Sequence, residues 1–309
     1  MALDSETMQG LLEGVARFVR ERLRPLEHQV AQEDRIPPEI RREIAAMGLF
    51  GLSIPEEYGG LGLTMEEEVR VAFELGKTSP AFRSLIGTNN GIGSQGLIMD
   101  GSEEQKQRYL PRLASGELIS SFALTEPEAG SDAASLKTLA RRVEGGYVLN
   151  GTKRFITNAP HAGLFTVFAR TDPSQPGAKG VSAFLVEAGT PGLSLGPVDK
   201  KMGQSGSHTS DVIFEDCRVP VANRVGKEGE GFRFAMAGLD GGRLNIGACS
   251  LGGAQAAFNA TLSYMAERQA FGQALNQFQA LQFRLAEQEV RLQSARLFLR
   301  QAAWKLDSG

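Results

Sequence analysis

The hydrophobic period of this chain changes twice along its length, from helical to strand-like and back to helical. Apolar residues recur at helical spacing up to residue 117 or so and again after Gly231. Between them lie short segments rich in Val, Ile, Phe, Leu and Thr, separated by Gly, Pro, Asn and Asp. The order predicts an α+β chain with an N-terminal helical domain (1–117), a middle antiparallel β domain of barrel or sandwich type (118–225), and a C-terminal helical bundle, incomplete here (226–309).

Local signals predict where the first helices begin and end. Asp4 or Ser5 can cap a helix that ends at Pro25, because proline lacks the backbone N–H that a helix interior uses. The run Pro37-Pro38-Glu39 predicts the start of a second helix, and Gly48 predicts its end.

Two further helix starts carry capping boxes. Thr64 precedes Glu67, and Ser102 precedes Gln105, both at the spacing at which side chains and backbone N–H groups cap each other. Two long helices are predicted near the C-terminus. They span about 229–266 and 277–306.

The strand-like segments are short and closed by turn residues. They are 118–124, 139–143, 147–149, 153–157, 165–170, 181–187 and 210–214. Glu144-Gly145-Gly146 and Asn150-Gly151 both match hairpin turns, so each predicts a reversal of the chain.

Composition excludes several classes of protein. The 309 residues carry a net charge of −3, which gives no electrostatic case for nucleic acid or an anionic membrane. Cys217 and Cys249 are too few for a disulfide framework. There is no apolar run of about 18 residues and no signal-peptide pattern, so we expect a cytoplasmic protein that does not span a membrane.

Three patterns resemble known sites only superficially. Gly91–Gly96 matches GxGxxG but lies in a helical region, so close packing or a substrate-wall loop explains it better than nucleotide binding. Gly192–Gly196 matches GxSxG, yet Pro197 follows at once, which argues against a hydrolase. The three histidines are too scattered to predict a metal site.

The segment from Phe122 to Asp132 carries the most chemical information. A predicted strand leads into Thr125, and a loop with free backbone N–H groups follows, so the hydroxyls of Thr125 and Ser131 could help to hold an anion. The alternative is an ordinary strand-to-loop corner capped by Ser131 or Asp132.

This segment resembles the flavin-binding signature of the acyl-CoA dehydrogenase family. Three other stretches resemble family motifs in the same order: Pro55-Glu56-Glu57-Tyr58-Gly59-Gly60, the strand Gly151–Asn158, and Arg268-Gln269-Ala270-Phe271-Gly272 with Gln279 beyond it. The resemblance covers essentially the whole chain, and four ordered motifs are specific where each alone is weak.

The resemblance implies FAD as cofactor, lying between the β domain and the C-terminal helices. Its implied FAD contacts within one protomer are Phe122, Leu124, Thr125, Ser131, Phe155, Ile156 and Thr157. The family often has Trp where Phe155 stands, and Phe lacks the indole donor. Arg268, Phe271 and Gln279 are implied to reach the FAD of a neighbouring subunit, which predicts a homo-oligomer, a dimer or a tetramer, with a shared site.

The resemblance also implies an acyl-CoA site. Ser131, Asp240 and Arg243 are the implied substrate contacts, and residues 85–99 are expected to line part of the acyl pocket. Lys201 and His208 are candidates for the border of the CoA entrance, although a solvated loop explains both better.

The reaction implied is α,β-dehydrogenation of an acyl-CoA thioester to the trans-2-enoyl-CoA, in fatty acid metabolism or amino acid catabolism, with electrons passed to an electron-transfer flavoprotein. A carboxylate takes the α proton while FAD accepts the hydride. In most members that Glu lies in a region beyond Gly309, and in two branches it stands where this chain has Gly242. We therefore assign no catalytic base and expect a C-terminally truncated sequence.

Two alternatives remain at this point. One is a related flavoenzyme with another acceptor, of the acyl-CoA oxidase or monooxygenase type. The other is a binding protein on the same fold that lacks the reaction.

Overall fold

The computed structural model describes residues 3–309, and its helices and strands follow the predicted order, helical, then β, then helical. The chain forms two compact units. Unit 1 comprises the described part of Met1–His28 with Thr64–Arg83 and Arg243–Gly309, and unit 2 comprises Gln29–Leu63 and Ser84–Gly242. The predicted α+β fold class is confirmed, while domain boundaries at 117 and 225 remain a prediction.

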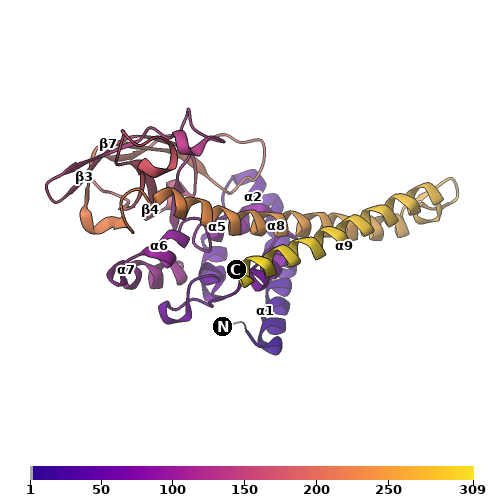
Figure 1. Cartoon of the computed structure of the whole chain (residues 1–309). Coiled ribbons are helices and arrows are strands. Elements are labelled where there is room, and N and C mark those ends of the chain that lie inside the picture. Colours follow the sequence, from indigo (N-terminus) through magenta and orange to yellow (C-terminus); the bar gives the residue numbers. More distant parts are fainter. Residues whose placement is uncertain (1–2) are drawn as a thin grey trace. The chain divides into compact units, whose positions relative to one another are not determined.

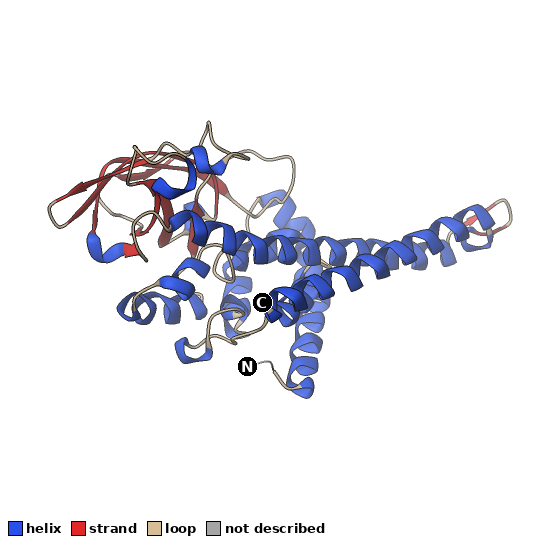
Figure 2. Cartoon of the chain, viewed as in Figure 1, coloured by secondary structure: helices blue, strands red, loops and turns tan. Residues whose placement is uncertain are grey.

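The helices differ greatly in length (Figures 1 and 2). They are α1 (Ser5–Phe18), α2 (Glu27–Glu33), α3 (Pro38–Ala46), α4 (Met65–Leu75), α5 (Pro80–Gly87), α6 (Gln95–Asp100), α7 (Glu103–Ala114), α8 (Gly231–Glu267) and α9 (Gln279–Ser308). None of the helices within residues 3–309 is both long enough and apolar enough to cross a membrane.

The predicted end of the first helix at Pro25 is wrong. The Asp4 side chain does cap α1, accepting a 2.9 Å hydrogen bond from the backbone N–H of Thr7. The chain then continues through a π-helical turn (Val19–Leu23) and a 3-10 turn (Arg24–Leu26) into α2. Pro25 lies in the first residues of the 3-10 turn, where no backbone N–H is needed, so it does not stop the chain from coiling.

The other cap predictions are confirmed. Pro38 is the first residue of α3, and Gly48 follows that helix in the left-handed conformation, with φ +72°. The capping boxes at α4 and α7 both form, and their Glu67 and Gln105 side chains accept hydrogen bonds from the cap residues' N–H groups.

The β domain is one eight-stranded sheet, and all of it belongs to unit 2. Its strands are β1 (Ser120–Ala123), β2 (Leu139–Val143), β3 (Gly146–Thr157), β4 (Leu164–Arg170), β5 (Val181–Glu187), β6 (Leu193–Leu195), β7 (Thr209–Pro220) and β8 (Arg224–Val225). The order is β6-β7-β3-β2-β4-β5-β8, with β1 beside β4. β3, β4 and β7 are labelled in Figure 1.

A purely antiparallel sheet was predicted, and this is wrong at two pairings. β1 runs parallel to β4, and β2 pairs with β4 in parallel through Leu139 and Arg170. Parallel neighbours need a long connection rather than a tight turn, and β2 and β3 supply it between β1 and β4.

One of the two hairpin predictions is confirmed. β2 and β3 form a hairpin at Gly145, which has φ +76°. Asn150-Gly151 is not a turn, because β3 is continuous from Gly146 to Thr157 and only shifts register there. Gly151 has φ +148°, and a Cβ on it would lie 2.5 Å from the Thr138 hydroxyl, so close packing explains this glycine. β6 and β8 were not predicted because they are only three and two residues long.

Unit 1 is held together by close approach of its helices. α4, α8 and α9 contribute Val69, Ala72, Ala248 and Ala303 to one apolar cluster. A Cβ on Gly76 would lie 2.2 Å from the Cys249 carbonyl oxygen, so α4 meets α8 with backbone nearly touching backbone. α8 and α9 run side by side and are joined by a short β hairpin (Figure 2).

Packing explains the GxGxxG match in unit 2. Gly93 lies between α5 and α6, and a Cβ on it would lie 2.3 Å from the Ser120 hydroxyl and 2.8 Å from the Thr88 carbonyl oxygen. Gly93 also accepts a 2.7 Å hydrogen bond from the buried Thr166 hydroxyl. The glycine therefore lets this loop lie directly on β1 and β4.

We expect Gly93→Ala to lower the free energy of unfolding by about 1–3 kcal/mol, because the added methyl group overfills a packed site. Urea denaturation measures the change. Gly203→Ala is the matched control, since a Cβ on Gly203 meets no atom within 4 Å. Equal stabilities of the two variants would contradict the packing interpretation.

Candidate functional site

The corner after β1 brings together two motif segments, residues 122–132 and residues 151–158. The Thr125 carbonyl oxygen accepts a 2.8 Å hydrogen bond from the Arg154 N–H on β3. Glu126 and Ala129 exchange backbone hydrogen bonds of 3.0 and 3.2 Å, which closes the loop into a tight turn. The two motif segments, 122–132 and 151–158, therefore form one continuous surface in unit 2.

A buried ion pair lies behind this corner. The Lys153 ammonium donates to the Glu126 carboxylate at 2.7 Å and to the Leu124 carbonyl oxygen at 3.1 Å. The two side chains are 0% and 6% exposed. Glu126 also accepts from the backbone N–H groups of Lys137 (2.6 Å) and Thr138 (2.9 Å), so its charge is satisfied from three directions.

Burial and pairing act on these two groups in different ways. Burial lowers the pKa of Lys153 to about 8, although the charge of Glu126 opposes that shift. Burial alone would raise the pKa of Glu126, but the Lys153 charge and the hydrogen bonds outweigh it and hold this pKa below the ordinary 4.5. Because the folded pKa of Glu126 is lowered, its stabilising contribution is present above pH 4.5 and is lost as the pH falls further.

We expect Glu126→Ala to lower the free energy of unfolding by about 3–5 kcal/mol at neutral pH, because Lys153 would be left buried without a counter-charge. The double variant Glu126→Leu/Lys153→Met should recover most of that loss. Urea denaturation at pH 7 measures both, and the gap between wild type and Glu126→Ala should narrow on acidification. A double variant as unstable as the single one would argue against a charge effect.

The corner turns hydroxyl groups and one aromatic ring outward. These could hydrogen-bond to a flat polar ring and stack against it. The half-buried hydroxyls of Thr125 and Thr157 and the exposed hydroxyl of Ser131 make no hydrogen bond within residues 3–309. Phe155 is 59% exposed and has φ +58°, a left-handed conformation that costs a non-glycine residue about 1–2 kcal/mol. The register shift between Lys153 and Ile156 is what turns Phe155 outward.

The other implied flavin contacts face inward. Leu124 and Ile156 are buried in the two apolar clusters of unit 2. The half-buried Phe122 packs on Phe168, with ring centroids 4.9 Å apart. These three residues can offer a ligand their backbone more readily than their side chains.

Arg154 supports the outward-facing aromatic ring. Its guanidinium lies 4.6 Å from the Phe155 ring centroid and donates to both Asp211 carboxylate oxygens, at 3.0 and 2.7 Å. Sequence reasoning missed Asp211, which is brought in by β7, 57 residues away.

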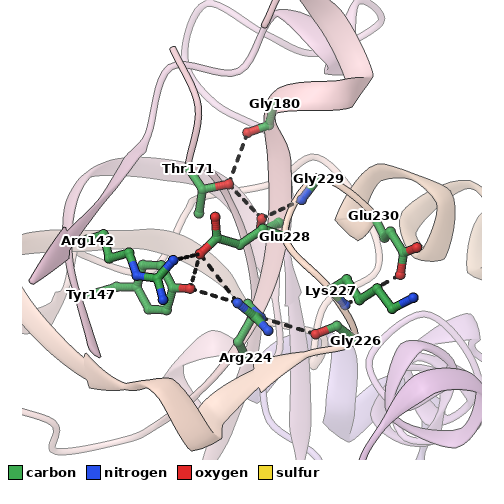
Figure 3. A network of polar contacts seen from close by, with 11 residues as sticks. Arg142, Tyr147, Thr171, Gly180, Arg224, Gly226, Lys227, Glu228, Gly229 and Glu230 are labelled. Carbon is green, nitrogen blue, oxygen red and sulfur yellow. Dashed lines mark hydrogen bonds and ion pairs between the residues drawn. The ribbon is translucent and has the colours of Figure 1, made fainter. Parts of the chain in front are cut away.

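A polar clasp anchors the loop before α8. It consists of Arg142, Tyr147, Arg224 and Glu228 (Figure 3). The Glu228 carboxylate accepts from the Tyr147 hydroxyl and from Arg224 at 3.3 Å, and it lies 3.5 Å from Arg142. Burial and the bond to Glu228 raise the pKa of Tyr147, so this hydroxyl remains a donor. By tying the loop at Glu228 to β2, β3 and β8, the clasp fixes the position at which α8 begins.

The first turns of α8 carry the implied substrate contact Asp240. Asp240 and Arg243 are both exposed and lie one helical turn apart, Asp240 in unit 2 and Arg243 in unit 1. In unit 2, α8 passes the loop before α6, where a Cβ on Gly242 would only touch Ile92, at 3.4 Å. Packing within the described chain therefore does not require glycine at position 242.

Asn158 joins the motif strand to the expected pocket wall. Its side-chain amide donates at 3.0 Å to the Ser84 carbonyl oxygen and at 3.0 Å to the Thr88 hydroxyl. Asn158 has φ +62°, a conformation that Asn tolerates better than most residues. Residues 84–88 are thereby held against the end of β3.

His208 and Lys201, the candidates for the border of the CoA entrance, both form hydrogen bonds within unit 2. His208 contacts His161 at 2.8 Å between ring nitrogens and the Asp34 carbonyl oxygen at 2.7 Å. Lys201 donates to the Ser207 carbonyl oxygen. The structure thus gives both residues a role in holding their own loop, and no cluster of three or more metal-ligating side chains occurs within the described residues.

Arg268, Phe271 and Gln279 lie together in unit 1, around the hairpin between α8 and α9. β9 (Gln269–Ala270) pairs with β10 (Gln273–Ala274), and the two residues between them have φ +52° and +78°. Two left-handed residues in a two-residue loop match a type I′ turn. All three side chains are exposed, and Phe271 is 96% exposed.

Known families match this chain along nearly all of its length. The descriptions that match are "Acyl-CoA dehydrogenase, N-terminal domain" over residues 5–117, "middle domain" over 121–217 and "C-terminal domain" over 229–309. The chain belongs to the acyl-CoA dehydrogenase family. It is accordingly an oxidoreductase of that family, as the four ordered motifs imply.

Individual relatives agree with this family assignment. The chain is 42% identical to an acryloyl-CoA reductase (NADH) of Anaerotignum propionicum over 97% of this chain and 77% of that protein. It is 39% identical to an acyl-CoA dehydrogenase of Bacillus subtilis, over 94% and 76%. Butyryl-CoA dehydrogenase from Megasphaera elsdenii has the same fold, with a TM-score of 0.94 at 34% identity, over 100% and 81%.

One solved relative contains a flavin. PigA, in a structure with FAD and proline, matches with a TM-score of 0.94 at 34% identity over 100% of this chain and 81% of that one. A flavin has a flat ring and polar edges, and the corner in unit 2 offers an aromatic surface at Phe155 and hydroxyls at Thr125, Thr157 and Ser131 that make no hydrogen bond within residues 3–309.

Proposed function

We propose that this chain is an FAD-dependent acyl-CoA dehydrogenase that converts an acyl-CoA thioester to the trans-2-enoyl-CoA. The observation that carries the proposal is the Thr125 corner. It leaves the hydroxyls of Thr125, Thr157 and Ser131 without a hydrogen bond within residues 3–309 and turns the Phe155 ring outward, with only Arg154 against it, on a strand whose sequence matches the family motif. A cytoplasmic location and no contact with nucleic acid or membrane accompany the proposal.

Each group of the corner has a distinct task in this function. FAD, when bound, accepts the hydride from the substrate's β carbon. Phe155 would cover one part of the flavin ring, and the hydroxyls of Thr125 and Thr157 would hydrogen-bond its polar edge. Ser131 would hold flavin phosphate or the thioester arm, and Asp240 and Arg243 would bind the CoA portion or order the pocket.

The α proton needs a carboxylate, and residues 1–309 supply none that we can assign. Position 242 is the one within this chain where some family members carry that Glu, and here it is glycine. The catalytic base is therefore left unassigned.

The electron acceptor we propose is an electron-transfer flavoprotein. A solved chain described with the electron transferring flavoprotein of Acidaminococcus fermentans matches at a TM-score of 0.94 and 39% identity, over 100% of this chain and 81% of that one. Peroxide release during turnover would instead identify an oxidase.

We also propose that a second protomer completes the FAD site with Arg268, Phe271 and Gln279. The exposed apolar side chains of α9 form a face that a second protomer, or further helices of the predicted bundle, could cover. These side chains are Phe283, Val290, Leu297, Phe298, Trp304 and Leu306. A guanidinium such as that of Arg268 suits the bidentate binding of a pyrophosphate.

We expect Phe155→Gly to weaken FAD binding about tenfold, equivalent to ~1.4 kcal/mol, because the ring that covers the flavin is lost. Stability of the FAD-free protein should change by less than about 1 kcal/mol, since relief of the left-handed strain offsets the lost contact with Arg154. FAD titration by fluorescence and urea denaturation measure the two effects. Phe155→Trp, which keeps an aromatic ring, is the control, and unchanged FAD affinity in the glycine variant would refute the role.

We expect Arg268→Ala to weaken FAD binding, and a mixture of Arg268→Ala with Phe155→Gly protomers to regain it in part. If two protomers share each site, random mixing of dimers leaves roughly a quarter of the sites with neither defect. FAD titration of each variant and of the refolded mixture tests this. A mixture that binds no better than its components would exclude a shared site.

A further inference from the structure

Burying the charges of Lys153 and Glu126 costs desolvation free energy, and a contribution to folding stability does not by itself account for the pair. Moving two charges out of water is expensive, and well-packed apolar side chains of similar size often serve a core equally well or better. Lys153 is fully buried on β3, where an aliphatic side chain would fit the apolar surroundings of the sheet. The groups that the pair contacts point to a functional reason for it.

The pair contacts the backbone at two places, the Leu124 carbonyl oxygen just before Thr125 and the segment Lys137–Thr138 that leads into β2. The Lys153 ammonium holds the Leu124 carbonyl oxygen at 3.1 Å, and the Glu126 carboxylate holds the backbone N–H groups of Lys137 and Thr138. The next residue of β3, Arg154, holds the Thr125 carbonyl oxygen through its own N–H. The carbonyl oxygens of Leu124 and Thr125 thus both accept hydrogen bonds from the protein. The Thr125 hydroxyl makes no hydrogen bond within the described residues.

The same strand segment also sets the aromatic ring. Lys153 points inward at the register shift, and two residues later Phe155 points outward in its left-handed conformation. An anchor on Lys153 therefore fixes both the Thr125 corner and the start of the bulge that exposes Phe155.

We infer that Lys153 and Glu126 are positioning residues for the flavin. They hold the Leu124–Thr125 backbone and the Phe155 bulge in their binding geometry, and they place a balanced pair of charges behind the proposed flavin-binding surface. This inference rests on the proposed function. It assigns to the pair an effect on FAD affinity and on the flavin's reduction potential that is separate from its effect on folding.

The test compares Lys153→Met and Glu126→Gln in the full chain. Each variant should raise the dissociation constant of FAD about tenfold, equivalent to ~1.4 kcal/mol. The reduction potential of the bound flavin should move in opposite directions when each variant is compared with wild type at a pH where its remaining group is charged, the acid side for Glu126→Gln and the alkaline side for Lys153→Met. Loss of the positive charge in Lys153→Met disfavours reduction and lowers the potential, whereas loss of the negative charge in Glu126→Gln raises it.

Leu149→Ala is the control for stability, because Leu149 is a fully buried residue of the same strand. It should destabilise the chain while leaving the FAD affinity and potential at their wild-type values. If Glu126→Gln fails to fold, Glu126→Asp replaces it. That variant keeps the charge and shortens the side chain, so it should weaken FAD binding without moving the potential.

The outcomes separate the two proposals. Failure of the wild-type chain to bind FAD would overturn the proposed function and this inference with it. A wild type that binds FAD beside variants with unchanged affinity would overturn only the inference. So would potentials that move in the same direction in Lys153→Met and Glu126→Gln, since that is the signature of a general loosening.

Discussion

A lysine ammonium inside a β-sheet core must find its counter-charge and hydrogen-bond acceptors within reach, or the chain does not fold around it. Lys153 finds both in the corner that follows β1, at Glu126 and the Leu124 carbonyl oxygen. The corner is fixed as a consequence, and so is the outward turn of the next residues of β3. The shape of the candidate flavin surface therefore depends on a contact that lies behind it.

The helix caps were predicted correctly from the sequence, because one residue and its near neighbours decide them. The capping boxes at Thr64 and Ser102 each involve residues three positions apart, so their chemistry is visible in the sequence itself. Pro25 was misread because proline can begin a 3-10 turn as easily as it ends an α-helix. Asn150-Gly151 was misread because glycine also serves close packing, here against Thr138.

Contacts between residues far apart in the sequence could not be predicted from local patterns. Lys153 and Glu126 are 27 residues apart and Arg154 and Asp211 are 57 apart, and neither spacing follows a helical or strand period. The parallel pairing of β1 with β4 depends on the whole sheet order. The structure does bring together two of the motif segments, those around Thr125 and Phe155, in unit 2. The implied flavin and substrate contacts in both units stay predictions.

The glycines of this chain fall into two kinds. At Gly76, Gly93 and Gly151 any side chain would collide with backbone or with a buried hydroxyl, so folding dictates the residue. Gly242 is different, because a methyl group there meets only the edge of Ile92 at an ordinary contact distance. Packing around the first side-chain atom therefore does not dictate glycine at this helical position. A fold that leaves position 242 free of this constraint can carry its proton acceptor on another segment while it keeps the same cofactor-binding surface.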